Sequence, residues 1–499
     1  MEEAISVSGP TVGVEEEFLL VDPVTGVAVN RADEVVAVAR QVFGLDLEHE
    51  LTGTQVEVNT SVCRDADQVR RELLGLRRTV ALAAREAGCR AVAVGAPPLG
   101  DTTGTITHGV RYRRIAREFG ALAGQQLICG CHVHVAVPDR ETAVQVCNHV
   151  RPWLPVLGAV TANSPFSGGA DTGFASWRSM VWSRWPVSGP PPVFASWQHY
   201  EALCDMMLSA GTVLDPAMVY WDVRPSARWP TVEVRVADVA AGIDDVVLLA
   251  ALVRALVTQA VADVRRGVPP VPVPAETLRQ ACWRAARDGL AGGALDVLSG
   301  QLVPLRRQLD DLVSRLTPVL QANGDLPSVR RGLRVLDRDG CGADRQRRAH
   351  RDGGVEALLG LVEVGEARTR SPRGVVEVKS FAEVDLSNCD ELERRCARAV
   401  DAGAEEVVLD LSEVRFFGSS GITALARIRA LGLERRVPIS VVASEAVARV
   451  LRATAMVTLL PLHVPPEMPL RRRDDGRGLT AGRAPRRCAA APGRGSTRW

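Results

Sequence analysis

Glutamates at alternate positions in a short apolar segment near the start of the chain are the first side chains that could do chemistry. Within Gly13–Leu20, Glu15 and Glu17 lie two residues apart, so in a strand they share one face and Glu16 takes the other. Two carboxylates on one face of an apolar strand repel each other unless a cation lies between them. The segment is therefore either a solvated edge strand or part of a cation site.

A second acidic segment follows about forty residues later. Glu57 lies in the Val-rich segment Gln55–Asn59, where a buried charge is costly unless it is paired or bound to metal. Glu50 lies seven residues earlier, where a helix or loop could bring it alongside Glu57. By itself this spacing is a weak indication of a site.

Two later segments add basic groups to the same kind of pattern. His132 and His134 share one face of a predicted strand, and Glu233 and Arg235 share one face of another. The second pair is either an ordinary ion pair or a metal ligand beside a phosphate-binding arginine.

Together, four predicted strands offer inward polar groups, which suits a funnel for several hard cations better than a core. Sites rich in carboxylates with a histidine suit Mg²⁺ or Mn²⁺. A zinc hydrolase using His132, His134 and Glu233 is an alternative, because Cys129 and Cys131 lie nearby. In a regular strand Cys131 would point away from the histidines, so we interpret the cysteines as small core residues.

Composition narrows the classes of function. Sixty basic residues against 59 acidic ones give a net charge of +1, so a nucleic-acid-binding surface is not indicated. The chain has a single lysine, Lys379, so phosphate chemistry before it must use arginine, backbone N–H groups or metal.

The same composition indicates the compartment. The 11 scattered cysteines and the lack of a signal peptide in Met1–Gly13 predict a reducing cytoplasm. Val246–Val261 is apolar but contains Arg254, and we expect a buried helix there with no membrane partner.

The elements that must position these residues fall into two units. Residues 11–362 form the predicted first domain, residues 363–373 a linker, 374–463 a small second domain and 464–499 a basic, disordered tail. The strands predicted in the first domain are Gly13–Leu20, Gln55–Asn59, Ala91–Gly95, His132–Val137 and Thr231–Val236. The helices predicted there are Ala66–Ala87, Glu141–Val160 and Asp244–Arg266.

The second domain is predicted to be a small α/β sandwich. Its predicted strands are Val375–Val378, Glu406–Leu411 and Val437–Ala443. Its predicted helices are Cys389–Ala402, Gly421–Leu431 and Ser444–Thr454.

Several strings of the first domain resemble, in order, the glutamate–cysteine ligase type 2 (carboxylate–amine ligase) family. They are GVEEEFLLVD, QVEVNTSVCRD, RYRRIAREFG, GCHVHV, NSPF, DTGFASWR, YWDVRPS and TVEVRVAD. The resemblance implies an α+β fold of the glutamine-synthetase-like kind, in which an antiparallel sheet with flanking helices forms the active-site funnel. The GAPP string after Ala91–Val94 departs from relatives, which often carry a histidine there.

The resemblance also implies the site and the reaction. It implies one magnesium site from Glu15, Glu50 and Glu57, and another from Glu17, His132 and Glu233. It implies that Arg235 contacts the transferring phosphate of ATP, and it makes Arg224 a candidate clamp for a substrate carboxylate.

The implied reaction joins L-glutamate, activated as an acyl phosphate, to an amine such as L-cysteine. The tryptophan-rich loop containing Trp177, Trp182, Trp185 and Trp197 would border the substrate pocket, and its Arg178 could reach substrate or nucleotide phosphate. Otherwise the loop is simply packed by its aromatic residues. We expect Glu57→Gln or Glu233→Gln to abolish turnover with little loss of folding.

The string VVLDLSEVRFFGSSGI at Val407–Ile422 resembles the STAS domain of anti-sigma-factor antagonists. In that family a partner kinase phosphorylates a serine at a helix start, and the added charge switches binding to an anti-sigma factor. Ser419 is the matching position, but Gly418 stands where the family usually has an acidic residue. The serines could instead simply cap the helix.

A regulatory protein is the alternative of a different class. In that interpretation the ligase-like domain is a degenerate ligand sensor that controls the STAS-like part. The intact metal-ligand positions favour the enzyme. A homo-oligomer is compatible with both interpretations.

Overall fold

A computed structural model describes residues 9–365, 375–401, 404, 406–412, 414–435, 437–453 and 462–463. The chain divides into two compact units, Met1–Arg368 and Thr369–Trp499, which are described separately here. Most of the predicted linker and all of the predicted basic tail lie outside the described residues.

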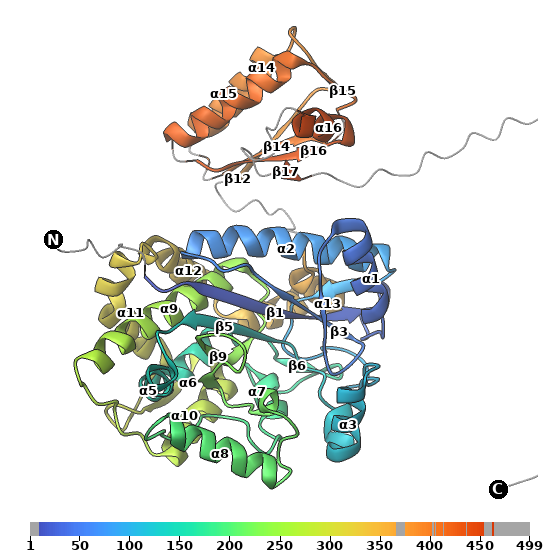
Figure 1. Ribbon diagram of the computed structural model, residues 1–499. Coiled ribbons are helices and arrows are strands. Elements are labelled where there is room, and N and C mark those ends of the chain that lie inside the picture. Colours follow the sequence, from blue (N-terminus) through green and yellow to red (C-terminus); the bar gives the residue numbers. More distant parts are fainter. Residues whose placement is uncertain are drawn as a thin grey trace, which may run out of the picture. The chain divides into compact units, whose positions relative to one another are not determined.

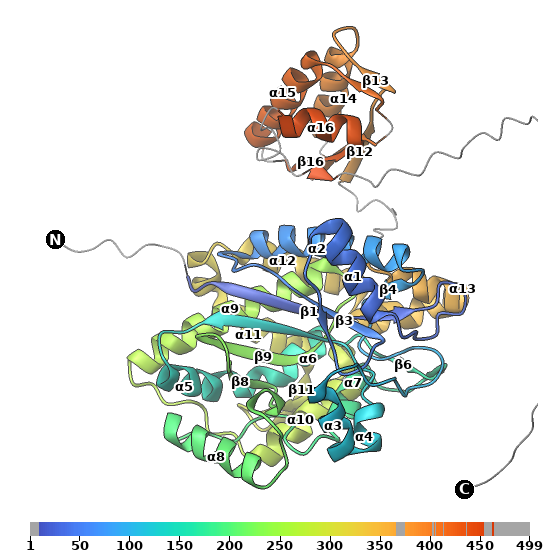
Figure 2. The same ribbon diagram turned by 45° about the vertical axis from the view of Figure 1, so that its right-hand side comes forward.

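A seven-stranded antiparallel sheet forms the centre of the first unit. Its strands follow the order β2-β3-β1-β5-β9-β8, and β4 pairs with the far end of β1. In two views β1, β5 and β9 lie side by side (Figure 1 and Figure 2). The strands are β1 (Val12–Val21), β2 (Glu48–His49), β3 (Gln55–Asn59), β4 (Arg90–Val92), β5 (Gly130–Ala136), β8 (Val223–Pro225) and β9 (Thr231–Asp238).

The alternation of side chains gives this sheet one apolar face and one polar face. On β5, Val133 and Val135 are fully buried in the main core, whereas His132 and His134 lie on the other face and line a pocket. Helix α9 (Ile243–Arg265) contacts β5 and β1, and α2 (Ala66–Glu86) and α5 (Arg140–Val150) pack against α9.

Helix α9 is the central core helix of this unit. Among the described helices it is the one long and apolar enough, by length and composition, to cross a membrane. Of its most apolar stretch, 78% is buried inside the domain, as expected for the predicted buried helix.

The remaining helices surround the sheet. They are α1 (Ala32–Phe43), α3 (Val110–Phe119), α4 (Ala121–Gly124), α6 (Leu154–Val160), α7 (Trp177–Trp182), α8 (Trp197–Ser209), α10 (Ala275–Asp288), α11 (Leu305–Ala322), α12 (Leu326–Asp339) and α13 (Gly342–Val362). Two short hairpins complete the unit, namely β6 (Phe166–Ser167) with β7 (Ala170–Asp171) and β10 (Gly293–Asp296) with β11 (Gln301–Pro304).

Two predicted elements differ from the structure. The single helix expected over Glu141–Val160 is divided into α5, a 3₁₀ turn at Arg151–Trp153 and α6. Pro152 and Pro155 lack the N–H groups that a continuous helix needs, which explains the break. The strand expected over Ala91–Gly95 is shorter in the structure, where β4 ends at Val92.

The second unit is an α/β fold, as predicted. Its four strands β12 (Val375–Lys379), β14 (Glu406–Leu411), β16 (Ile439–Ala443) and β17 (Leu462–His463) form a parallel sheet in that order. Helices α14 (Cys389–Asp401) and α15 (Ser419–Arg435) pack against each other, and α16 (Glu445–Ala453) follows β16. Two further short strands, β13 (Glu383–Val384) and β15 (Phe416–Phe417), pair beside them.

Candidate active site

The polar face of the large sheet is the floor of a pocket of about 770 Å³. The carboxylate, histidine and arginine side chains predicted from the sequence for the site all line this pocket, and they come from segments up to 220 residues apart. They are Glu15, Glu17, Glu50, Glu57, His132, His134, Arg178, Arg224, Glu233 and Arg235.

Three carboxylates gather on one side of the pocket. Glu17 of β1 lies opposite Glu57 of β3, and Glu50 immediately follows β2, which pairs with β3. Oxygen atoms of Glu17, Glu50 and Glu57 all lie within 4.8 Å of one another. The backbone N–H of Gly130 donates to Glu17 Oε2 at 2.6 Å and fixes that side chain.

This acidic group is electrostatically strained when no cation is bound. Burial, reinforced by Glu17, raises the pKa of Glu50 to about 7. Burial and the charges of Glu50, Glu15 and Glu17 raise the pKa of Glu57 well above its usual range. A cation between these oxygens would relieve the repulsion.

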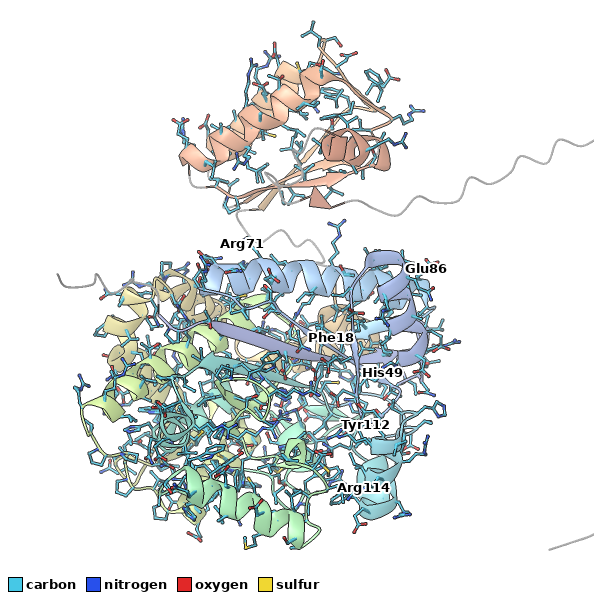
Figure 3. The ribbon with its side chains drawn as sticks, in the orientation of Figure 1. Phe18, His49, Arg71, Glu86, Tyr112 and Arg114 are labelled. Carbon is cyan, nitrogen blue, oxygen red and sulfur yellow. The ribbon has the colours of Figure 1, made fainter. Side chains whose placement is uncertain are left out.

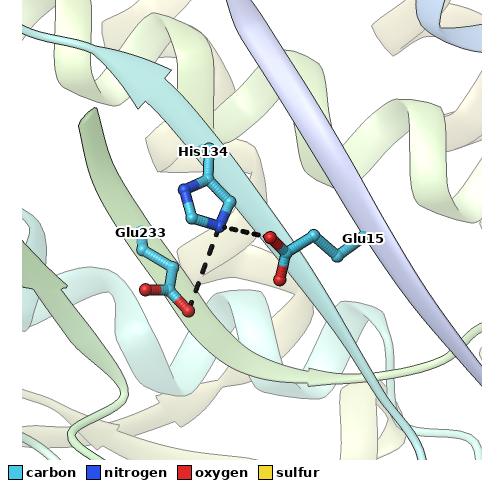
Figure 4. A group of neighbouring side chains, drawn as sticks. All are labelled: Glu15, His134 and Glu233. Atoms are coloured by element: carbon cyan, nitrogen blue, oxygen red, sulfur yellow. Dashed lines mark ion pairs between the residues drawn. The ribbon is translucent and has the colours of Figure 1, made fainter. Parts of the chain in front are cut away.

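Two histidines contact Glu15 in the middle of the pocket. His132 Nδ1 lies 3.0 Å from Glu15 Oε2, and His134 Nε2 lies 3.0 Å from Glu15 Oε1. Figure 4 shows Glu15, His134 and Glu233 converging from β1, β5 and β9. Burial alone would raise the pKa of Glu15, but the two histidines outweigh it and hold the pKa well below its usual range.

The second imidazole nitrogen of His132, Nε2, is buried and lies 3.7 Å from Glu17 Oε1, with no hydrogen bond to it among the described residues. Burial and the charge of Arg235 lower the pKa of His132, and its Nδ1 lies 3.0 Å from Glu15 Oε2 and 3.4 Å from Arg235 Nη1. A histidine that contacts a carboxylate through one ring nitrogen commonly binds metal through the other.

Glu233 is held by two arginines on the other side of the pocket. Arg224 Nε donates to Glu233 Oε2 at 2.8 Å, and Arg235 forms a close ion pair with Glu233 Oε1. Burial would raise the pKa of Glu233, but these guanidinium groups hold it well below its usual range.

Arg224 and Arg235 differ in how many of their guanidinium N–H groups have acceptors. Arg224 Nη1 also donates to the carbonyls of Ala217 and Val219, so its contacts fit a residue that positions Glu233. Arg235 keeps a buried Nε without a partner in the described part of the chain. The substrate-clamp role of Arg224 stays a prediction.

Unpaired donors collect at the end of the pocket beside Arg235. Buried N–H groups of Arg178, Trp182 and Gln126 lack partners among the described residues, and all three residues line the pocket. The guanidinium carbons of Arg178 and Arg235 lie 5.6 and 5.9 Å from the ring centre of Trp182. Such a concentration of donors suits a phosphate or carboxylate group.

The donor set fits divalent cations, although the ligands group differently from the expected sets. Within the described part of the chain, three groups have ligand atoms within 4.8 Å of one another. They are Glu17 with Glu50 and Glu57, Glu15 with Glu57 and His132, and Glu15 with His134 and Glu233. The two expected magnesium sets stay predictions.

Sequence reasoning missed several residues of the site. Glu48 and Gln126 line the pocket but lie in segments without a strong strand pattern. Tyr112 of α3 also lines it and donates to the carbonyl of His49 at 2.6 Å (Figure 3). Of the loop tryptophans, Trp182 and Trp185 line the pocket, whereas Trp177 and Trp197 do not.

In the second unit, Ser419 is exposed and is the first residue of α15. The preceding Gly418 donates its N–H to the carbonyl of Val384 at 2.8 Å. Space for a Cβ exists at Gly418, since its nearest neighbour would be an atom of Phe416 at 3.5 Å.

Comparison with known families matches both units. The model of "Glutamate-cysteine ligase family 2" matches residues 11–360, and that of "STAS domain" matches residues 366–464. A Nocardia farcinica protein named "Putative glutamate--cysteine ligase 2-1" is 51% identical over 359 residues, which cover 72% of this chain and 93% of that protein. A Mycobacterium protein (strain KMS) named "Putative glutamate--cysteine ligase 2-2" is 52% identical over 343 residues, covering 68% and 94%.

Solved structures share the fold at low identity. A glutamate–cysteine ligase from Francisella tularensis in complex with AMP superposes with a TM-score of 0.55 and 14% identity, covering 71% of this chain and 88% of that one. A bifunctional glutathione synthetase from Pasteurella multocida gives a TM-score of 0.52 and 13% identity, covering 71% and 52%.

Proposed function

The chain belongs to glutamate–cysteine ligase family 2 and carries a STAS domain, and on this premise we propose that it is an ATP- and magnesium-dependent carboxylate–amine ligase. Its proposed reaction joins the γ-carboxylate of L-glutamate to the amine of L-cysteine and releases ADP and phosphate. The names of its half-identical relatives support these substrates.

One observation carries the proposal: a buried acidic group and unpaired basic donors share one pocket. Glu17, Glu50 and Glu57 lie on one side, and Arg178 and Arg235 line the same cavity. This charge separation suits a metal–triphosphate complex, whose cations need carboxylates and whose phosphates need N–H donors. The intact acidic group favours an enzyme over a degenerate sensor.

In the proposed reaction a glutamate carboxylate attacks the γ-phosphorus of ATP, and ADP leaves. The amine nitrogen then attacks the carbonyl carbon of the acyl phosphate, phosphate leaves with the C–O bond electrons, and the amine loses a proton. Bound Mg²⁺ would neutralise phosphate charge and polarise the transferring group.

The chain itself supplies positioning and charge. Glu15, Glu17, Glu50, Glu57, His132 and Glu233 would hold the cations. Arg235, whose guanidinium remains charged beside Glu233, would contact the transferring phosphate, and Arg178 would bind nucleotide or substrate oxygens. Arg224 would keep Glu233 in place.

ADP release with Mg²⁺ and ATP, measured with and without L-glutamate and a panel of amines, tests the proposal. Release that requires both glutamate and cysteine is expected. Release that requires glutamate and a different amine would retain the ligase and replace the acceptor. Absence of amine-dependent release from folded protein would overturn the ligase.

For the STAS domain we infer a docking role for an anti-sigma factor or a kinase, with Ser419 as the modified residue. The exposed position of Ser419 supports access by a kinase. Mass spectrometry of the protein purified from its own cells should find phosphate on Ser419. Its consistent absence across growth conditions would leave docking without a phosphoswitch, as the glycine at position 418 suggests.

The compartment proposed for this reaction is the cytoplasm. All ten cysteines in the described part of the chain are free thiols, which fits a reducing environment.

A further inference from the structure

A fully buried carboxylate behind the pocket receives three hydrogen bonds and has no part in the reaction proposed above. Asp238 is the last residue of β9, the strand that carries Glu233 and Arg235, and it is 1% exposed. Asp238 Oδ2 accepts from the N–H of Asn163 at 2.9 Å and from Ser164 Oγ at 2.6 Å. Its Oδ1 accepts from Ser176 Oγ at 2.8 Å.

Both serines, which donate to Asp238, also accept hydrogen bonds from backbone N–H groups at the start of helix α7. Ser164 Oγ accepts the N–H of Arg178 at 3.0 Å, so its one proton is free for Asp238. Ser176 is the N-cap of α7, accepts the N–H of Ser179 at 3.3 Å and gives its own proton to Asp238. The first turn of α7 is therefore attached to β9 through two hydroxyl groups.

The residue held in this way is Arg178, whose guanidinium has very little room to move. Its Nη2 donates to the carbonyl of Arg235 at 3.3 Å, and it is 2% exposed. A Cβ at Gly130 of β5 would lie 2.5 Å from Arg178 Nη2, so the guanidinium lies directly against that backbone. A buried Nε of Arg178 still lacks a partner in the described residues.

We propose that Asp238, Ser164 and Ser176 form a clamp that positions Arg178 for the phosphate or carboxylate oxygens of a substrate. The inference rests on the proposed function for the identity of the ligand, and it adds three positioning residues that contact no substrate themselves. Strand β9 carries Glu233, a proposed metal ligand. Through Asp238 and the two serines, the same strand also sets the position of Arg178, which comes from a different segment.

A double-mutant cycle on Ser176 and Arg178 tests the clamp. We expect Ser176→Ala to lower kcat/KM for ATP by about 10- to 100-fold, mainly through KM, because small displacements of a positioning group are costly. In an Arg178→Met background the same change should cost less than about 3-fold, because the group that the clamp positions is already missing.

Two matched variants separate positioning from general damage. Ser176→Thr retains the hydroxyl and should restore most of the loss. Ser183→Ala removes a hydroxyl at the opposite end of α7, where Ser183 Oγ donates to the carbonyl of Met180 at 2.8 Å, and it should leave the kinetic constants unchanged. Equal losses from Ser176→Ala in both Arg178 backgrounds would overturn the clamp.

The dissociation constant of ATP in the presence of Mn²⁺ gives a readout independent of turnover. Calorimetry measures it on the four proteins of the cycle, namely the unaltered chain, Ser176→Ala, Arg178→Met and the double variant. If the unaltered protein binds ATP but releases no ADP with any amine, the ligase proposal fails and the binding cycle still tests the clamp. Additive effects of the two substitutions on that constant would reject the clamp, and loss confined to the intact Arg178 background would support it.

Discussion

Three consecutive glutamates in β1 have three different electrostatic surroundings. Glu15 contacts two histidines, and Glu17 lies beside Glu50 and Glu57. Glu16 is on the opposite face, where Arg77 Nε donates to it at 2.8 Å and no exposed surface remains. Two of the three carboxylates are thus available to a cation, and the third is a buried structural ion pair.

Glu57→Gln should stabilise the protein when metal ions are removed with EDTA. The folded state raises the pKa of this carboxyl, so its charge opposes folding once the pH exceeds the unfolded value of about 4.3. We expect a gain of about 1 kcal/mol in the free energy of unfolding near pH 7, and none below pH 4. Urea unfolding at both pH values measures it.

The same substitution should lower ADP release by about 100-fold or more, because it removes the charge of a proposed metal ligand. Near-normal turnover by Glu57→Gln would show that the metal assignment is wrong.

Glu233→Gln should behave in the opposite way in unfolding experiments. Its pKa is held low by Arg224 and Arg235, so its stabilising charge is present above pH 4.3 and is lost as the pH falls towards the folded value. Removal leaves two buried guanidinium groups underpaired, at a cost of about 3 kcal/mol. The sequence-based expectation of little loss of folding is therefore revised for this residue.

An exposed ion pair supplies the control for Glu233→Gln. Asp310 pairs with Arg306 on the surface of α11, and Asp310→Asn should cost less than about 1 kcal/mol. Equal small costs for both substitutions would contradict the buried-pair account.

At the level of elements, two helix glycines should respond oppositely to alanine. Gly75 in the middle of α2 has no neighbouring atom within 4 Å of a built Cβ, so Gly75→Ala should raise the free energy of unfolding by about 0.5–1 kcal/mol. At Gly332 of α12 a Cβ would lie 2.7 Å from the Cβ of Leu248 in α9, so Gly332→Ala should destabilise. Chemical unfolding of both variants gives the comparison, and a shared sign would refute the packing described here.

The sequence predicted the strands that carry the site better than the segments between them. Alternating Val and charged residues located β1, β3, β5 and β9 to within about two residues, because period-two alternation is a local signal. The break within Glu141–Val160 was not predicted, because the long helical pattern of this segment masked the effect of Pro152 and Pro155. The groupings around Glu15 and Glu57 depend on strand order, which no local pattern contains.

Residues that act through others were the hardest to foresee. Asp238, Ser164 and Ser176 are separated by up to 74 positions, and a serine in a loop ordinarily indicates a turn. Their role depends on the approach of three backbone segments.

At the scale of the whole molecule, the place where the first domain ends determines whether it can stand alone. Val362 and Val364 are 1% and 2% exposed, and they exchange backbone hydrogen bonds with Ala93 and Ala91 at 2.8 and 2.9 Å. The half-identical Nocardia farcinica relative has 93% of its length within the match, so it resembles this domain without the second one.

A chain ending at Arg368 should therefore fold and keep its ligase activity. A chain ending at Gly360 should lose at least about 3 kcal/mol, because two buried valines and their strand pairing are removed. Thermal unfolding and ADP release of the two truncated proteins test this. Equal stability would show that Val362–Val364 contributes nothing, and an inactive but folded longer form would show that turnover needs the STAS domain.

Glu16 points to one face of the sheet, and Glu15 and Glu17 point to the other. This alternation affects which register β1 adopts when the sheet assembles. If β1 paired one residue out of register, Glu15 and Glu17 would both enter the apolar layer, where Arg77 now pairs with Glu16 alone, while Val14 and Phe18 would face water. Such a slipped state would carry unpaired buried charge as well as exposed apolar surface. The alternation of charged and apolar residues in β1, which builds the site, therefore also disfavours the wrong register of this central strand during folding.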